Sequence, residues 1–429
     1  MKLMLAAFLS AAVGQSAFAA DVASLVPLAN LESQARARTS ATPRVPLAPE
    51  AAESLRGVES FEAQGSGRVP NYLRALAMIK PAATKPFAHL LKTFVYAGDV
   101  SPALKLAMAL RIAQVNRSPY TVAHVSRLLH ATGAEGDAYL AKLRGNQVDS
   151  LAPADRLALR WAEQQAVDIH GMSDEEFRQL GGWYNDSEIV ELTLTVCVFN
   201  YFTRFVEGLG LPMEPWALDA NVKPAAPPVW TRDRAPARVA LITDEEMAAT
   251  ARAGAAATRA SAGGLGLGML NAQRAMLRVP ALAAAWNQFS AATGQSSVGR
   301  ELLLQVSFAV SMANGCRYCT MHQVVGLRQL GVDPTKLLAM EKDDAALTPR
   351  EKTAVLFARK LSATPWASTD ADYAALRKEF QDQGALEVLM QTSYFNFMNR
   401  FTDGLRLPSE DEAIKVYREI YGRDGLRPR

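Results

Sequence analysis

Cysteine is scarce in this chain of 429 residues: there are three, and two of them lie three positions apart. A scaffold of disulfides is therefore excluded, and the pair indicates a local redox or metal site beside one isolated thiol, Cys197. Runs that alternate Val, Ile or Thr with polar residues are also few, whereas Ala and Leu dominate. This composition favours helices over sheet, and we predict an all-α protein.

The chain also lacks an excess of charge of one sign. Its 46 basic and 43 acidic residues are interspersed and leave a net charge of +3, with no stripe of Lys and Arg. We therefore expect no nucleic-acid partner. Hydrophobic residues make up 49% and charged residues 21% of the chain, which excludes a largely disordered chain and a multi-span membrane protein.

The N-terminal segment 1–19 is typical of a secretory signal peptide. Lys2 precedes an apolar run, Leu3 to Val13, that is too short to span a bilayer. The small-x-small pattern Ala17-Phe18-Ala19 predicts cleavage after Ala19. We therefore expect a periplasmic or secreted protein without a membrane span after signal removal. An ordinary N-terminal helix is the alternative.

An internal repeat is the main organising feature of the sequence. The segment Phe199 to Pro212 recurs as Phe395 to Pro408, with the same Phe-Asn, Arg-Phe and Leu-Pro pairs. The same spacing aligns two helix starts, Ser173 and Thr369, each with a carboxylate three residues later that can complete a cap. Phe199 to Leu209 has apolar residues on one helical face. We predict two tandem helical domains that form a pseudo-dimer within one chain.

The predicted organisation follows from this repeat and from the composition of the segments between its copies. A lead-in segment with little helical period follows the signal, and a Pro-rich linker joins the copies. The predicted parts are the signal peptide 1–19, the lead-in 20–60, the first copy 61–220, the linker 221–258 and the second copy 259–420.

The second copy contains a Cys-x-x-Cys motif at the expected start of a helix. Asn314 is the expected N-cap, which would put Cys316 in the first turn and Cys319 one turn later on the same face. A helix N-terminus favours the thiolate, so we expect a lowered pKa for at least one thiol. His322 lies over the same face and can exchange a proton with Cys319.

The first copy has lost the cysteine pair. Ser118 and Thr121 occupy the two positions, while His124 corresponds to His322. Because hydroxyls cannot form a disulfide, we predict that the first copy is catalytically silent and that His124 has a packing role.

Other interpretations of Cys316 and Cys319 stay open: a buried thiol pair or a static disulfide. A zinc site would use the two cysteines and His322, but these supply only three ligands. Haem attachment is excluded, because it requires a His directly after Cys319. Cys197 lies between two valines and is interpreted as a core residue.

The motif Asn314-Gly315-Cys316-Arg317-Tyr318-Cys319 with His322, followed downstream by Phe395-Asn396-x-x-Asn399-Arg400-Phe401, resembles the carboxymuconolactone decarboxylase-like family, also called AhpD-like. The resemblance covers both copies. It implies an all-α fold, assembly into trimers or hexamers, and two fused copies that act as one pair of such a homo-oligomer. It also implies reduction of hydroperoxides through the cysteine pair, with a His and Glu proton relay and a disulfide that a reductant must reduce.

The chain departs from the family pattern in two places. Two residues rather than three separate Cys319 from His322, a spacing that still keeps both on one helical face. The position of the relay Glu is occupied by Leu304 and Gln305, and the nearest carboxylate is Glu301, one turn further back. Glu301 is therefore the candidate relay acid.

We predict an exported thiol oxidoreductase of the alkylhydroperoxidase, or peroxiredoxin-like, type that acts on a hydroperoxide or disulfide substrate. It needs no organic cofactor and no metal. Cys319 would attack, Cys316 would resolve and His322 would relay the proton, although the opposite order of the cysteines stays open. The alternative is a non-redox binding or assembly protein, or a cofactor-free decarboxylase of a cyclic lactone.

Overall fold

The computed structural model describes residues 25–58, 68–170, 172–218, 269–293, 296–342 and 346–422, together with residues 243, 245, 246 and 344. Every α-helix or 3-10 helix assigned there fits the predicted all-α class, and no strand occurs within these residues. The predicted signal peptide and its cleavage site lie outside the described residues, as does almost all of the predicted linker. We call residues 25–218 the first half and residues 269–422 the second half.

Proline begins many of the helices, because its fixed φ suits the first turn and its missing N–H is not needed there. Ser173 and Thr369 begin helices with capping boxes, as predicted. The helices of the first half are α1 (Leu28–Ala37), α2 (Asn71–Ile79), α3 (Pro81–Tyr96), α4 (Pro102–Val115), α5 (Pro119–Ala131), α6 (Ala134–Arg144), α7 (Pro153–Val167), α8 (Asp174–Gly181) and α9 (Asp186–Leu209). The helices of the second half are α11 (Asn271–Met276), α12 (Pro280–Ala292), α13 (Arg300–Asn314), α14 (Arg317–Gln329), α15 (Pro334–Lys342), α16 (Pro349–Ala363), α17 (Asp370–Gly404) and α18 (Asp411–Tyr421).

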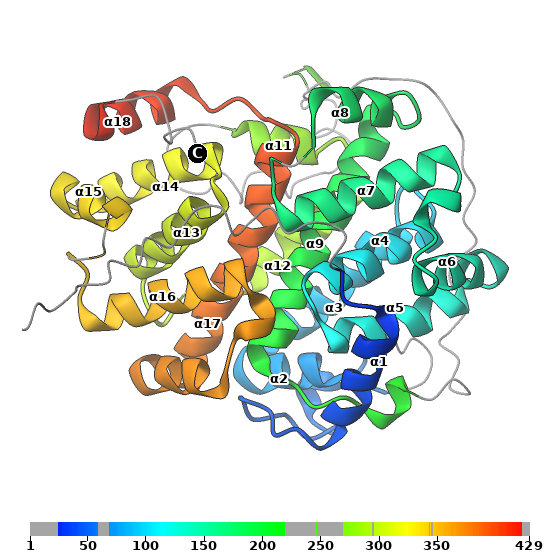
Figure 1. Ribbon diagram of the computed structural model, residues 1–429. Helices are drawn as coiled ribbons and strands as arrows, with labels where there is room; N and C mark the ends of the chain where they lie inside the picture. The colour runs from blue at the N-terminus through cyan, green and yellow to red at the C-terminus, as the bar shows by residue number, and fades with distance from the viewer. Residues whose placement is uncertain are drawn as a thin grey trace, which may run out of the picture.

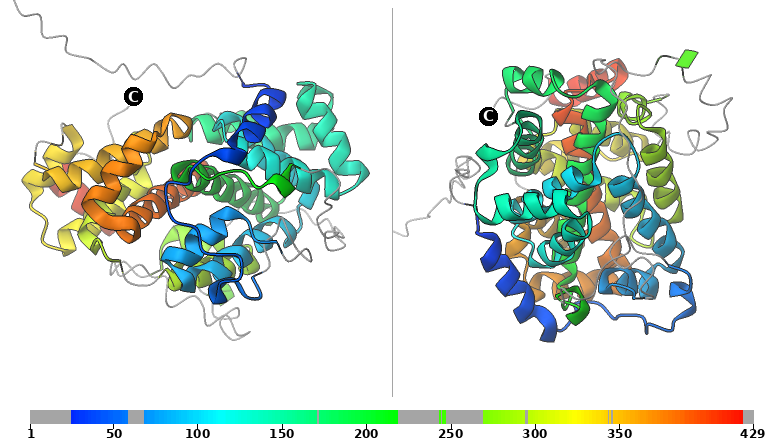
Figure 2. Two further views of the ribbon diagram at one scale, coloured as in Figure 1. Left: turned by 90° about the horizontal axis from the view of Figure 1, so that it is seen from below. Right: turned by 90° about the vertical axis from the view of Figure 1, so that its right-hand side faces the viewer.

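Helices α9 and α17 pack against each other through the middle of the molecule (Figure 1). Figure 2 shows the same pair from below, and α3 packs against α12 beside it. A Cβ atom on Gly208 would lie 2.3 Å from Cδ1 of Leu389, so glycine permits this close approach of α9 to α17. Helix α17 is interrupted at Gln381, which has a φ of 59°.

Helix α9 is enclosed on all sides. It is long and apolar enough to cross a bilayer, but its most apolar window is 100% buried within the protein. The predicted helix over Phe199 to Leu209 is the C-terminal part of α9, and its apolar face is buried as expected. Its other faces are buried as well, because α17, α4, α7 and α5 cover them. The core of the molecule lies around this helix.

Two buried arginines link the halves at corresponding positions of the repeat. Arg204 in α9 donates to the carbonyl oxygen of Ser362 at 2.9 Å. Arg400 in α17 donates to the carbonyl oxygen of Ala166 at 3.1 Å. Each arginine thus binds the backbone of the other half, which makes the interface polar as well as apolar.

The predicted lead-in segment contains a helix, contrary to the expectation of little helical period. Leu28, Leu31 and Ala35 of α1 are buried, and α1 packs against α5. A short helix gains most of its stability from such packing rather than from its own sequence, so the local pattern gave little sign of it. Arg38, the residue after α1, forms an ion pair with Glu207 of α9 at 2.7 Å and ties this segment to the core helix.

Candidate active site

The two cysteines lie where α13 ends and α14 begins. Gly315 has a φ of 74°, in the left-handed region, and this ends α13 at Asn314. Cys316 is the N-cap of α14, and its Sγ accepts the N–H of Cys319 at 3.2 Å. The prediction that Asn314 caps the helix is therefore wrong, because the glycine separates Asn314 from α14.

Asn314 instead anchors the end of α13 to α17. Its side-chain nitrogen donates to Oδ1 of Asn396 at 3.2 Å and to Oδ1 of Asn399 at 2.9 Å. Asn116 makes the corresponding contact in the first half, with Oδ1 of Asn200 at 3.0 Å. These amides fix the helix end that precedes the cysteines.

Both thiols are free and almost fully buried. Cys316 is 0% exposed and Cys319 is 3% exposed. The hydroxyl oxygen of Thr402 lies 3.4 Å from Sγ of Cys316 and 3.3 Å from Sγ of Cys319. Cys316 also donates from Sγ to Oδ1 of Asp403 at 3.3 Å. The two sulfurs therefore share one hydroxyl, and Cys316 has a carboxylate partner as well.

Burial raises the pKa of the Cys316 thiol well above its usual value, and the hydrogen bond with Cys319 and the charge of Asp403 raise it further. The expected lowering by the helix start is therefore wrong for Cys316. Burial is the main cause, and Asp403 adds to it, because its Oδ2 accepts the N–H of Arg317 at 3.2 Å. The carboxylate thus takes a first-turn N–H that would otherwise stabilise a thiolate.

His322 has a hydrogen-bond acceptor at each ring nitrogen. Nδ1 lies 2.6 Å from the carbonyl oxygen of Tyr318, and Nε2 lies 2.6 Å from Oε2 of Glu410. The ring stacks on that of Tyr318 with centroids 4.1 Å apart. Because both partners accept hydrogen bonds, the arrangement suits an imidazolium beside an ionised carboxylate.

Glu410 is the N-cap residue of α18 and holds His322 in place. Its Oε1 also accepts the hydroxyl of Tyr318 at 3.0 Å and the N–H of Asn271 at 2.6 Å. Burial raises the pKa of Glu410, but the hydrogen bond and charge of His322 and the N–H of Asn271 outweigh burial and lower it. Glu410 is therefore suited to remain a carboxylate next to His322.

The structure does not bring Glu301 to the cysteines. This residue lies in the first turn of α13 with its side chain 46% exposed, and its carboxylate pairs with Lys336 at 3.1 Å. It also accepts the side-chain N–H of Gln305 at 2.9 Å. The carboxylate that contacts His322 comes instead from Glu410, in the segment between α17 and α18, which was not among the predicted site residues.

The first half keeps a version of these contacts without sulfur. Nε2 of His124 lies 3.1 Å from Oε2 of Glu214, and Tyr120 donates its hydroxyl to Oε1 of Glu214 at 2.6 Å. Ser118 donates its hydroxyl to Thr121 at 2.8 Å. Among the described residues, Nδ1 of His124 has no hydrogen-bond partner. The repeat was thus the signal that could have identified Glu410, the counterpart of Glu214.

A cavity of about 340 Å³ lies beside Cys319. Cys319, His322 and Tyr318 line it, whereas Cys316 does not. Of the described residues around it, none is Lys or Arg. A ligand in this cavity therefore meets Cys319 before Cys316. Apolar side chains make up much of the remaining wall: Leu270, Met276, Trp286, Leu304, Tyr394, Phe395 and Met398.

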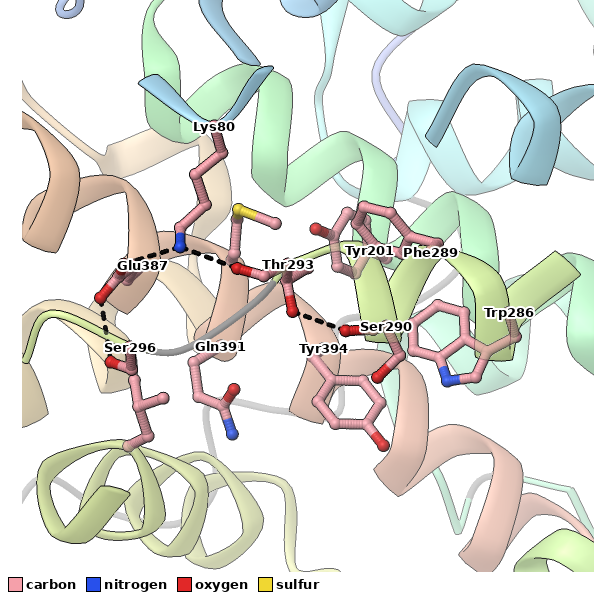
Figure 3. A pocket seen from close by; sticks show the side chains of 12 residues that line it. Lys80, Tyr201, Trp286, Phe289, Ser290, Thr293, Ser296, Glu387, Gln391 and Tyr394 are labelled. Carbon is pink, nitrogen blue, oxygen red and sulfur yellow. Dashed lines mark hydrogen bonds and ion pairs between the residues drawn. The ribbon is translucent and has the colours of Figure 1, made fainter. Parts of the chain in front are cut away.

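A smaller cavity of about 120 Å³ adjoins the first (Figure 3). Lys80 of the first half lines it and pairs with Glu387 of α17 at 2.7 Å. Lys80 also donates to the carbonyl oxygen of Thr293 at 2.9 Å, so its charge is already satisfied by protein groups. The two cavities share four lining residues: Trp286, Ser290, Gln391 and Tyr394.

The described residues contain no group of three or more His, Cys, Asp or Glu side chains placed to hold a metal ion. The zinc set considered from the sequence would need a ring nitrogen of His322. Nε2 of His322 is bonded to Glu410 and Nδ1 to the carbonyl oxygen of Tyr318. The two cysteines and His322 therefore do not form a complete set of zinc ligands among the residues that the structure describes.

Comparisons with known proteins give one match. No curated protein and no solved structure matches the chain. The model of the carboxymuconolactone decarboxylase family matches residues 280–360, from the start of α12 into α16. The match includes the cysteine pair and His322 and ends before Asp403 and Glu410. The helices that carry the dithiol, within residues 280–360, are thus similar to the carboxymuconolactone decarboxylase family.

Proposed function

We propose that the protein is a thiol-dependent oxidoreductase that reduces hydroperoxides, or exchanges disulfides, through Cys316 and Cys319. The observation that carries this proposal is the placement of the two sulfurs. Cys319 lines a mainly apolar cavity together with His322, and Cys316 lies beside it, outside the cavity wall. An attacking and a resolving thiol need this arrangement.

The reaction with a hydroperoxide has two steps. The thiolate of Cys319 attacks the terminal peroxide oxygen, the O–O bond breaks and an S–O bond forms. Cys319 becomes a sulfenic acid and the hydroperoxide is reduced to an alcohol, whose oxygen takes a proton from His322. Cys316 then attacks the sulfur of Cys319, a disulfide forms and water leaves. An external thiol reductant returns the disulfide to two thiols.

The test is to mix the pre-reduced protein with cumene hydroperoxide and to count thiols by mass spectrometry after alkylation. We expect the loss of two thiols, at Cys316 and Cys319, while Cys197 in the core stays reduced. Cys319→Ser should abolish the reaction, and Cys316→Ser should stop at a sulfenic acid on Cys319. If Cys316 and Cys319 stay reduced and Cys197 alone reacts, the proposal is wrong.

A cofactor-free decarboxylase is the second candidate, favoured by the description of the matching family model. A carboxylated lactone is an anion, and the described residues around the cavity include no Lys or Arg to bind its carboxylates. Replacing both cysteines by Ser separates the candidates. Decarboxylation that survives the replacement would support the second candidate, and the same holds for a non-redox binding role.

Export and assembly belong to the same proposal. The N-terminal pattern ending at Ala19 supports a periplasmic or secreted location. The reciprocal contacts of Arg204 and Arg400 across the halves support a fused pair of related domains. We propose that copies of this pair form a homo-oligomer, which light scattering would test by its mass in solution.

A further inference from the structure

A second set of titratable groups surrounds Cys316, apart from the cavity that contains Cys319. Oδ1 of Asp403 accepts the thiol of Cys316, and Oδ2 lies 3.6 Å from Nε2 of His170. Nε2 of His170 also lies 3.2 Å from the carbonyl oxygen of Gly315. His170 belongs to the first half, between α7 and α8. The half without the cysteine pair therefore contributes a residue to the surroundings of the dithiol.

Cys316 must lose its proton when it forms a disulfide, and its surroundings restrict where the proton goes. Its side chain is fully buried and does not line the substrate cavity. Among the described residues, the side-chain oxygens bonded to its sulfur belong to Thr402 and Asp403. The hydroxyl of Thr402 already donates to the carbonyl oxygen of Met398 at 2.9 Å, and a hydroxyl is a poor base. The carboxylate of Asp403 is the suitable acceptor.

We propose that Asp403 is the base that takes the proton of Cys316 when this cysteine attacks the oxidised Cys319, and that His170 sets the charge of Asp403. This inference rests on the proposed redox function. The proton moves from Sγ of Cys316 to Oδ1 of Asp403 as the S–S bond forms and the S–O bond of Cys319 breaks. The departing hydroxide takes one proton from the solvent side and leaves as water, and Asp403 then releases its proton.

The electrostatics around Asp403 fit this role. Burial raises its pKa, whereas the charge of His170 and the hydrogen bonds from Cys316 and the N–H of Arg317 act in the opposite direction. A carboxylate with a raised pKa is a better acceptor for a thiol proton than an ordinary one. Burial thus makes Asp403 a stronger base, and the charge of His170 partly offsets this effect.

The proton has an outlet close to Asp403. Asp403 and His170 line a small hollow of about 50 Å³ that has no described lining residue in common with the cavity beside Cys319. His170 is 48% exposed. The other charged groups nearby are Asp174 and Arg406, which pair with each other, and Asp168, which accepts the backbone N–H of His170 at 3.0 Å. His170 is therefore the titratable side chain next to Asp403 that can exchange protons with the solvent.

The test separates the two steps of the reaction. Pre-reduced protein is mixed rapidly with cumene hydroperoxide, and quenched samples are analysed for sulfenic acid, trapped with a cyclic 1,3-dione, and for the disulfide. In Asp403→Asn we expect an unchanged rate of Cys319 oxidation and a disulfide rate lowered by ~100-fold, the low end of the contribution of a general base. The matched control is Glu207→Gln, because Glu207 holds the corresponding position and bonds Ser118 at 2.7 Å.

His170→Gln keeps a donor for the carbonyl oxygen of Gly315 but cannot carry charge. We expect the plot of the rate of disulfide formation against pH to lose one inflection between about pH 5 and 8, while the rate of Cys319 oxidation keeps its pH dependence. A purely structural role of His170 would not produce this difference. Unchanged or faster disulfide formation in Asp403→Asn would overturn the inference, because Asp403 would then only repel a thiolate. If the wild-type protein forms neither sulfenic acid nor disulfide, the proposed function itself fails.

Discussion

The contact between Glu410 and His322 allows the most direct test of the site. The change Glu410→Gln keeps the size of the side chain but removes the charge that faces Nε2 of His322 at 2.6 Å. A hydrogen bond to a charged group contributes about 1.5–3 kcal/mol. Because 1.36 kcal/mol corresponds to tenfold, the loss of this charged hydrogen bond corresponds to a factor of about 10 to 150. We therefore expect reduction of cumene hydroperoxide to slow by a similar factor at neutral pH and to recover as the pH falls.

The repeat supplies a matched control for this experiment. Glu214→Gln removes the corresponding carboxylate, which contacts His124, Tyr120 and the N–H of Asn71 in the first half. It disturbs a similar network without a cysteine pair, so the rate of peroxide reduction should not change. Stopped-flow measurement of Cys319 oxidation between pH 5 and pH 9 covers both variants. Equal losses in the two variants, or a loss in Glu410→Gln that does not depend on pH, would refute the role of the imidazolium.

Three further predictions concern stability and processing. Lys105→Met removes the cation that lies 2.6 Å from the buried carboxylate of Glu191, and it should lower the free energy of unfolding, measured by urea denaturation, by about 3–5 kcal/mol. The control Arg56→Met breaks an exposed ion pair with Glu53 and should change this free energy little. Burial raises the pKa of Glu351, but hydrogen bonds from Lys336, the N–H of Thr348 and Gln305 outweigh burial and bring it from 4.5 to about 2. Because the pKa of Glu351 is lower in the folded than in the unfolded protein, its contribution to the free energy of unfolding is present above pH 4.5 and is lost as the pH falls towards 2. If Glu351→Gln loses stability between pH 4.5 and 2 as steeply as the wild type, this prediction is wrong. The mature protein should begin at Ala20, and mass spectrometry of exported protein that still contains Met1 would disprove cleavage.

Local sequence features predicted the helical class, and they predicted a helix start next to the dithiol, where α14 begins. The caps at Ser173 and Thr369 and the motif from Cys316 to His322 depend on residues a few positions apart, so their spacing alone indicates their geometry. The cap of α14 was mispredicted because one left-handed glycine, Gly315, moved the helix boundary by two residues. Such a shift depends on a single dihedral angle.

The groups that contact Cys316 and His322 from elsewhere in the chain could not be found from the spacing within the motif. Glu410 is 88 residues from His322, and Asp403 is 87 residues from Cys316. His170 lies further away still, in the other half, and meets Gly315 only because α7 and α17 pack together. The spacing also gave no sign that the pKa of Cys316 is raised, because burial, the main cause, and the nearby charge of Asp403 both arise from the tertiary fold.

The absence of the cysteine pair from the first half fits a difference in what surrounds the corresponding positions, Ser118 and Thr121. Glu207, the counterpart of Asp403, bonds Ser118 and also pairs with Arg38 at 2.7 Å, so the predicted lead-in segment covers the carboxylate that would otherwise serve a thiol. Asp403 instead faces His170, whose charge depends on pH. A permanent cation would keep the carboxylate ionised and weaken it as a base, whereas a histidine allows it to accept a proton and release it. The first half therefore contributes His170 to the surroundings of Asp403, whereas its own corresponding carboxylate, Glu207, is paired with Arg38.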